Sequence, residues 1–160
     1  MTFIIKQATI ENIDEISKLY DEYRISDNQK SDLNGVKSFL SDCFKNKESI
    51  IFYAVEAKSN NLIGFTQLFT SFASISMKRS LILNDLYVCE CSRNQGVAKL
   101  LLDAVKSYAI QVKAYGIGLT TEINNDNAQR LYEKNGYKKD LSVYQYYMDI
   151  NQEMVACSKI

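Results

Sequence analysis

The most informative absence in this chain of 160 residues is histidine, which does not occur at all. Histidine is the commonest general base near neutral pH, so Ser-His-Asp triads, Cys-His pairs and most catalytic zinc sites are excluded. Cysteine is sparse, and Cys43, Cys89, Cys91 and Cys157 are spaced like neither a disulfide framework nor a zinc site. We therefore expect reduced thiols, no bound metal, and chemistry that uses carboxylates, tyrosines, water and backbone amides.

An excess of charge of either sign is also missing, because nineteen basic residues balance nineteen acidic ones. Binding to a phosphate backbone needs a basic excess, so nucleic acid is not an expected partner. No stretch approaches the roughly 20 apolar residues that span a membrane, and the apolar run near the N-terminus is too short for a signal peptide. We expect a cytoplasmic protein with no membrane partner.

Proline is absent and glycine occurs six times, and we find no internal repeat, low-complexity tract or linker-like shift in composition. A chain of this length buries roughly 68–70% of the surface that its unfolded form exposes, which is enough for one core. We therefore expect one domain over residues 1–150, followed by a C-terminal tail at 151–160.

Hydrophobic periodicity predicts strands and helices that alternate along the chain. Strands are expected at 3–9, 49–57, 62–73, 80–88, 117–124 and 142–150, and helices at 11–24, 31–46, 96–115 and 126–136. Ser31 is a candidate N-cap of the second helix, and Gly136 is the expected residue just beyond the end of the last one. The resulting order, βααβββαβαβ, indicates an α/β fold with a mixed sheet.

The stretch RNQGVA, residues 93–98, follows a predicted strand and opens an apolar helical pattern. The N-terminus of a helix leaves backbone N–H groups unpaired and carries about half a positive charge, so it favours an anion. Gly96 removes a side chain where a backbone approaches a ligand, and Arg93 adds positive charge. A diphosphate suits this geometry, although the chain has neither a Walker A loop nor the three-glycine dinucleotide fingerprint.

Two segments together resemble the GNAT superfamily of N-acetyltransferases, and the resemblance covers residues 3–149. RNQGVA is similar to the Q/R-x-x-G-x-G/A loop of that superfamily, and NDNAQRLYEKNGY, residues 125–137, is similar to its N-x-x-A-x-x-L-Y-x-x-x-G-[FY] segment. The resemblance implies a GNAT-like mixed central β-sheet flanked by helices, and transfer of an acetyl group from acetyl-coenzyme A.

The same resemblance implies how the cofactor binds. Backbone amides of the loop would hold the pyrophosphate, and the end of the preceding strand would pair with the pantetheine arm as an added strand. An N–H near Val88 would polarise the thioester carbonyl. Asn127 matches the pantetheine-facing asparagine of the superfamily, and Tyr132 matches the tyrosine near the coenzyme sulfur. The expected cofactor residues are Leu86, Tyr87, Val88, Arg93, Asn94, Gln95, Gly96, Val97, Ala98, Lys99, Asn127 and Tyr132.

Acetylation of an amine needs a group that takes its proton, because an alkyl amine with a pKa of about 10.4 is only about 0.04% neutral at pH 7. Without histidine the candidate bases are Asp85 and Glu122, acting directly or through water. Polyamine-type members of the superfamily often carry an acidic pair where this chain has Asn84 and Asp85, so the first position does not take the proton directly. Tyr132 would donate a hydrogen bond to the sulfur and protonate it.

By the same resemblance, the first two helices and the segment before the central strand build the acceptor pocket. The candidates are Tyr20, Tyr23, Arg24, Gln67 and Phe72. We expect direct attack in a ternary complex by the primary amine of a small molecule, and a protein N-terminus or lysine is the alternative acceptor. A third possibility is a non-catalytic module that binds or senses acyl-coenzyme A. The sequence also leaves a homodimer open.

Overall fold

The computed structural model describes residues 1–150, so the predicted tail at 151–160 lies outside the described residues. The chain divides into two compact units, of which the first is Met1–Asp126 and the second begins at Asn127.

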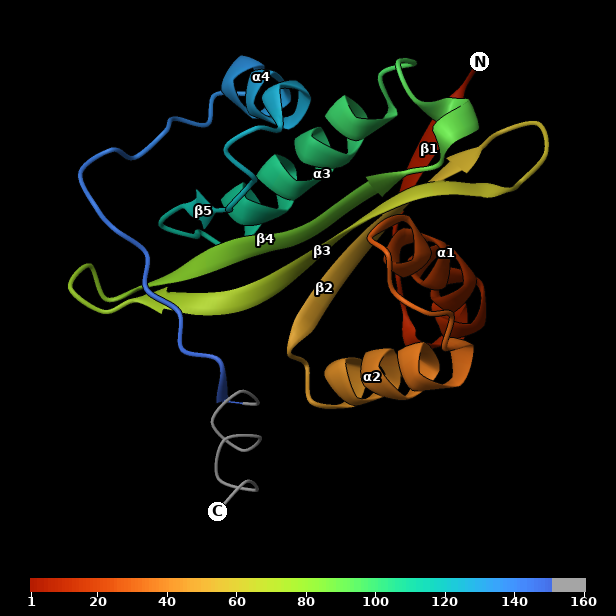
Figure 1. The fold of residues 1–160 in the computed structure, drawn as a ribbon, viewed down its shortest axis with the longest axis horizontal. Helices are drawn as coiled ribbons and strands as arrows, with labels where there is room; N and C mark the ends of the chain where they lie inside the picture. Colours follow the sequence, from red (N-terminus) through yellow and green to blue (C-terminus); the bar gives the residue numbers. More distant parts are fainter. Residues whose placement is uncertain (151–160) are drawn as a thin grey trace. The chain divides into compact units, whose positions relative to one another are not determined.

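A five-stranded sheet with the order β1-β2-β3-β4-β5 forms the centre of the first unit (Figure 1). Its strands are β1 (Phe3–Gln7), β2 (Ser49–Glu56), β3 (Leu62–Ala73), β4 (Lys78–Val88) and β5 (Ile117–Gly118). The first four pair antiparallel with their neighbours, and β5 is parallel to β4. The mixed sheet that the sequence predicts is therefore confirmed.

Helices cover both faces of this sheet (Figure 1). Helices α1 (Ile13–Ser26) and α2 (Leu33–Lys45) pack on one face against β2 and β3, whereas α3 (Val97–Gln111) packs on the other. Two short 3-10 helices, Ile10–Asn12 and Glu90–Ser92, precede α1 and α3. The core between α1, α2 and the sheet is aliphatic and aromatic, and its most deeply buried members are Ile16, Leu40, Ile51 and Phe65.

The start of α2 shows why the predicted cap was wrong. Its N-cap is Asp32, whose carboxylate accepts a hydrogen bond of 2.9 Å from the backbone N–H of Gly35. The Ser31 hydroxyl donates instead to the Asp21 carboxylate at 2.6 Å, and so links α1 to the chain before α2. Serine and aspartate are both common N-cap residues. Because the Ser31 hydroxyl binds Asp21 of α1, Asp32 caps the helix.

Three predicted elements differ in extent from those observed. Helix α3 ends at Gln111 rather than at 115, because Lys113 adopts a left-handed conformation with a φ of 55°. Strand β5 has only two residues of the eight predicted at 117–124. Within residues 1–150 no strand forms at 142–150, so the observed order is βααβββαβα. A strand needs a paired neighbour, and a strand as short as β5 offers no edge on which another could extend.

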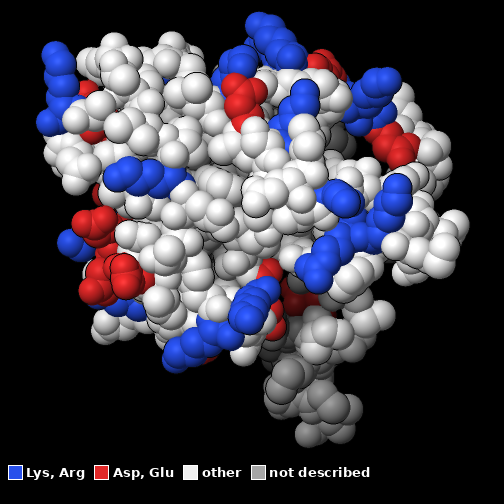
Figure 2. Space-filling model, turned by 180° about the vertical axis from the view of Figure 1, so that it is seen from behind, with Lys and Arg blue, Asp and Glu red and all other residues white. Residues whose placement is uncertain are grey.

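Helix α4 (Asp126–Lys134) leads into the second unit. It ends near Gly136, which adopts the left-handed conformation with a φ of 90°, as the sequence predicts for the residue beyond a helix. Within residues 1–150 none of the helices has both the length and the apolar character needed to cross a membrane. Figure 2 shows Lys and Arg side chains interspersed with Asp and Glu on the face that it draws.

Candidate active site

The loop between β4 and α3 is held in place by its own polar side chains. Arg93 donates from Nε to the carbonyl oxygen of Val88 at 3.0 Å, which ties the loop to the end of β4. Gln95 donates from Nε2 to the carbonyl oxygen of Cys91 at 3.0 Å. Asn94 and Gly96 both have a positive φ, of 60° and 84°. The loop therefore reaches α3 through two left-handed residues, a conformation that glycine adopts readily.

The N-terminus of α3 is open to a ligand. Gly96 is the N-cap, and among the described residues no side chain caps it. The first hydrogen bond of the helix runs from the N–H of Leu100 to the carbonyl of Gly96, so the N–H groups of Val97, Ala98 and Lys99 have no acceptor within the helix. A Cβ atom built on Gly96 would meet no heavy atom within 4 Å. Unpaired N–H groups beside open space fit an anion such as a diphosphate.

The end of β4 has one free edge beside this loop. Leu86, Tyr87 and Val88 pair with β3 on one side, whereas β5 pairs with β4 only at Leu81 and Ile82. Among residues 1–150 no strand pairs with the other edge of β4 at Leu86–Val88. An exposed strand edge of this kind can accept an extended chain through main-chain hydrogen bonds, as the pantetheine arm would require.

Asp85 is the buried carboxyl group of this site, with 5% of its surface exposed. The Tyr20 hydroxyl and the Asn84 amide both donate to its Oδ2 atom, at 3.5 and 3.2 Å. Burial raises the pKa of Asp85, and hydrogen bonds from Asn84, Tyr23 and Tyr20 act in the opposite direction. A buried carboxyl with a raised pKa beside a candidate ligand loop has the properties of a general base.

Aromatic rings surround Asp85 on the side of α1. Tyr20 stacks on Phe65 with ring centroids 5.1 Å apart, and Tyr23 lies edge-on to Phe65 at 5.8 Å. Tyr87 also packs against Tyr23, at 5.6 Å. Burial and then the Asp85 charge raise the pKa of Tyr20, so its phenol stays protonated and remains a donor. The structure therefore places Tyr20 and Tyr23 against the candidate base.

Of the other predicted acceptor residues, Gln67 lies beside Asp85, whereas Arg24 and Phe72 do not. Gln67 is fully buried and lies opposite Asp85 in the pairing of β3 with β4. Arg24 forms an ion pair of 3.2 Å with Asp21 in α1. Phe72 pairs with Arg79 near the β3–β4 turn, about 17 Å along the strand from Gln67 at about 3.4 Å per residue.

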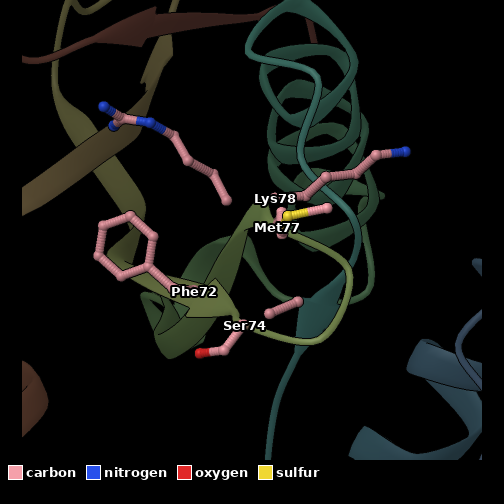
Figure 3. Close-up of a pocket in the computed structure, with 6 residues that line it drawn as sticks. Phe72, Ser74, Met77 and Lys78 are labelled. Atoms are coloured by element: carbon pink, nitrogen blue, oxygen red, sulfur yellow. The ribbon is translucent and has the colours of Figure 1, made fainter.

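The surroundings of Phe72 form a separate hollow of about 380 Å³ at the β3–β4 turn. Figure 3 shows Phe72 and Met77 on the two sides of that turn, with Lys78 next to Met77. Phe72 is 69% exposed, in contrast to the closed surroundings of Asp85. This hollow is not part of the site around Asp85.

Glu122, the second candidate base, is exposed and lies in an irregular segment after β5 instead of in a strand. Tyr132 lies in α4, and its ring packs edge-on against Tyr137 with centroids 5.7 Å apart. Burial raises the pKa of Tyr132, so it is a protonated donor at neutral pH. The Asn127 side chain accepts a hydrogen bond of 2.9 Å from Arg130 within the same helix.

Two residues near the site were missed by reasoning from the sequence. Asn84 is the extra residue of a β-bulge in β4, because Gln67 pairs with Asp85 and the next residue, Leu68, pairs with Leu83. Thr66 donates from its hydroxyl to the carbonyl oxygen of Asp85 at 2.8 Å. Both residues orient Asp85. The family resemblance points to position 84 but not to its role, because the bulge is visible only in the pairing of the two strands, and no sequence signal marks Thr66.

Comparison with known proteins agrees with this geometry. Residues 13–137 match the model of the acetyltransferase (GNAT) family, and the chain belongs to that family. It is 42% identical over 146 residues, 91% of this chain and 97% of the other, to an uncharacterized N-acetyltransferase of Bacillus subtilis (strain 168), YhfO. It is 32% identical to a D-amino-acid N-acetyltransferase of Saccharomyces cerevisiae (strain ATCC 204508 / S288c) over 91 residues, 57% of this chain and 56% of that one.

The structural comparison gives the same result. The crystal structure of a probable acetyltransferase superimposes with a TM-score of 0.87 at 37% sequence identity, and the match covers 92% of this chain and 97% of that one. The predicted superfamily and the α/β fold with a mixed sheet flanked by helices are therefore confirmed.

Proposed function

We propose that this member of the family transfers an acetyl group from acetyl-coenzyme A to the primary amine of a small molecule, by direct attack in a ternary complex. The observation that carries the proposal is the buried Asp85 carboxyl on the strand whose free edge and following loop suit the cofactor. The burial of Asp85, which is 5% exposed, favours a slender amine over a folded protein surface.

The residues present fit the cofactor. The N–H groups at the start of α3, from Gly96 to Lys99, would hold the pyrophosphate, and Gln95 and Asn94 would shape the loop that presents them. Leu86–Val88 would pair with the pantetheine arm. Arg93 would act indirectly, because its guanidinium group binds the carbonyl oxygen of Val88 and thereby holds the loop in place. Acetyl-coenzyme A supplies the activated acetyl group.

By the resemblance, Asn127 is the residue that faces the amide of the pantetheine arm. Asn125 is a second candidate, because it stands three residues before Ala128, as the first asparagine of the N-x-x-A pattern does. Its backbone N–H donates to the carbonyl of Glu122 at 3.1 Å. Replacing each asparagine with alanine and measuring cofactor affinity separates the two assignments.

The chemistry requires two proton transfers. Acetyl-coenzyme A would supply a thioester carbonyl carbon to the neutral amine, so that a C–N bond would form and the C–S bond to the leaving thiol would break. Asp85 accepts the amine proton, and its raised pKa brings it closer to the working pH than an exposed aspartate. By the resemblance, Tyr132 would donate to the leaving sulfur and would be reprotonated from solvent. The departing thiol has a pKa of about 8.5, so it needs only moderate assistance.

The experiment is a continuous assay of thiol release from acetyl-coenzyme A with a panel of small amines and of peptides that carry a free N-terminus or a lysine. We expect release with small amines and little with peptides. Release with peptides alone would show that the acceptor is a protein N-terminus or lysine and not a small molecule. If the protein binds acetyl-coenzyme A but releases thiol with no acceptor, the result would refute the enzyme and support an acyl-coenzyme A sensor.

A further inference from the structure

Gln67 is a fully buried polar side chain on β3, with 0% of its surface exposed. Neither its Oε1 atom nor its Nε2 atom has a hydrogen-bond partner among the described residues. Leaving such a group buried and unpaired destabilises a folded protein, whereas an apolar side chain of similar shape would not. A side chain that carries this cost without a structural partner points to a ligand.

The position of Gln67 indicates which ligand. Gln67 and Asp85 are directly opposed on neighbouring antiparallel strands, where Cβ atoms lie about 4.5–5.5 Å apart on the same face of the sheet. That face is the one covered by α1, because Phe65, two residues before Gln67, stacks on Tyr20, which also reaches Asp85. The unpaired amide therefore lies beside the candidate base.

A side-chain amide offers both an acceptor and a donor. The amine nucleophile can satisfy the acceptor, because one of its N–H groups can donate to Oε1. It cannot satisfy the donor, because its lone pair must point at the thioester carbon during attack. The Nε2 group therefore requires an oxygen elsewhere on the acceptor. A carboxylate in that place would lie against the buried Asp85 carboxyl, which like-charge repulsion disfavours.

We propose that Gln67 is a specificity-determining residue that selects amines carrying a nearby neutral oxygen, such as amino alcohols, over plain alkyl amines. The inference rests on the proposed function, since it names the acceptor class of the same site. Gln67 holds the amine through Oε1 and the neutral oxygen through Nε2, while Asp85 takes the proton. The Tyr20 hydroxyl, 3.5 Å from Oδ2 of Asp85, lies at the same carboxyl group.

The test compares ethanolamine with n-propylamine, which differ by a hydroxyl in place of a methyl group. The quantity measured is the ratio of their kcat/KM values in the wild type and in Gln67→Met, which keeps the length of the side chain and removes the amide. The different pKa values of the two amines cancel, because both proteins see the same pair. We expect the ratio to fall about tenfold in Gln67→Met, as the loss of one hydrogen bond predicts.

The same variant has an expected effect on stability. Removing the unpaired amide should raise the Tm of the protein without substrate by about 2–6 °C. Ser17→Ala is the matched control, because Ser17 is also fully buried and its hydroxyl has no partner among residues 1–150. It should raise Tm and leave the ratio of the two amines unchanged. Gln67→Asn, which keeps the amide but withdraws it, should lower the ratio in the same way as Gln67→Met.

An unchanged ratio in a folded Gln67→Met protein overturns the inference and leaves the proposed function standing. A wild type that releases thiol with other acceptors but with neither of these amines overturns it too. A wild type that releases thiol with no acceptor at all refutes the proposed function, and the inference with it.

Discussion

The phenol of Tyr20 in α1 reaches the carboxylate of Asp85 in β4 across 65 positions of the sequence, with 3.5 Å between the hydroxyl oxygen and Oδ2. Burial raises the pKa of both groups, so the tyrosine stays a donor and the carboxyl takes up a proton more readily than an exposed aspartate. The contact joins the helical layer to the strand that leads into the β4–α3 loop. Asp85 is consequently the residue on which activity and stability should both depend.

Asp85→Asn should lower kcat/KM for an accepted amine, and most steeply at neutral pH, where nearly all of the amine is protonated. Raising the pH should rescue the variant, because solution then supplies the neutral amine. The measurement is a pH–rate profile from about pH 6 to about pH 10 for both proteins. Parallel profiles would remove Asp85 as base and direct attention to Glu122 or to a water held by backbone carbonyls.

The stability of the same variant should depend on pH in a defined direction. The pKa of Asp85 is raised in the folded state, so the native protein holds a proton that the unfolded chain releases first, and stability falls as the pH rises above the ordinary value of 3.8. Asparagine cannot ionise and avoids this loss. The Tm of Asp85→Asn relative to wild type should therefore be higher at pH 7 than at pH 4. Calorimetry that finds the same difference at both pH values would show that burial does not perturb this carboxyl.

Gly96→Val should abolish binding of acetyl-coenzyme A. A β-branched side chain would fill the open space beside the start of α3, and the φ of 84° adds backbone strain. Titration calorimetry measures the affinity, and a melting curve checks that the variant folds. Gly116→Val is the control for added bulk, because a Cβ there also meets nothing within 4 Å. Wild-type affinity in a folded Gly96→Val protein would refute the assignment of the loop.

Tyr132→Phe should lower kcat about ten- to a hundredfold and leave the apparent KM for the cofactor nearly unchanged. The lost hydroxyl acts mainly as charge grows on the sulfur, and a hydrogen bond to a charged group contributes about 1.5–3 kcal/mol. Tyr137→Phe is a matched control, because its ring packs against Tyr132 and the family pattern accepts phenylalanine at that position. A kcat equal to that of the wild type in Tyr132→Phe would exclude this phenol from the reaction.

The sequence by itself determined the features that depend on a few neighbouring residues. The apolar stripes of α1 and α2, the β2–β3 hairpin and the left-handed glycine at 136 all agree with their predictions. Side-chain periodicity and the conformational freedom of glycine act over one turn or one strand, so they can be read without knowledge of the fold.

Only the tertiary structure decided which distant residues meet. It brought Tyr20, Tyr23 and Gln67 to Asp85, left Phe72 at a remote turn, and placed Glu122 outside any strand. It also limited β5 to two residues, although the alternating pattern after Ile117 favours an extended strand. Strand length, bulges and the burial of a polar side chain depend on backbone pairing and packing between segments far apart in the sequence, and no local pattern contains that information.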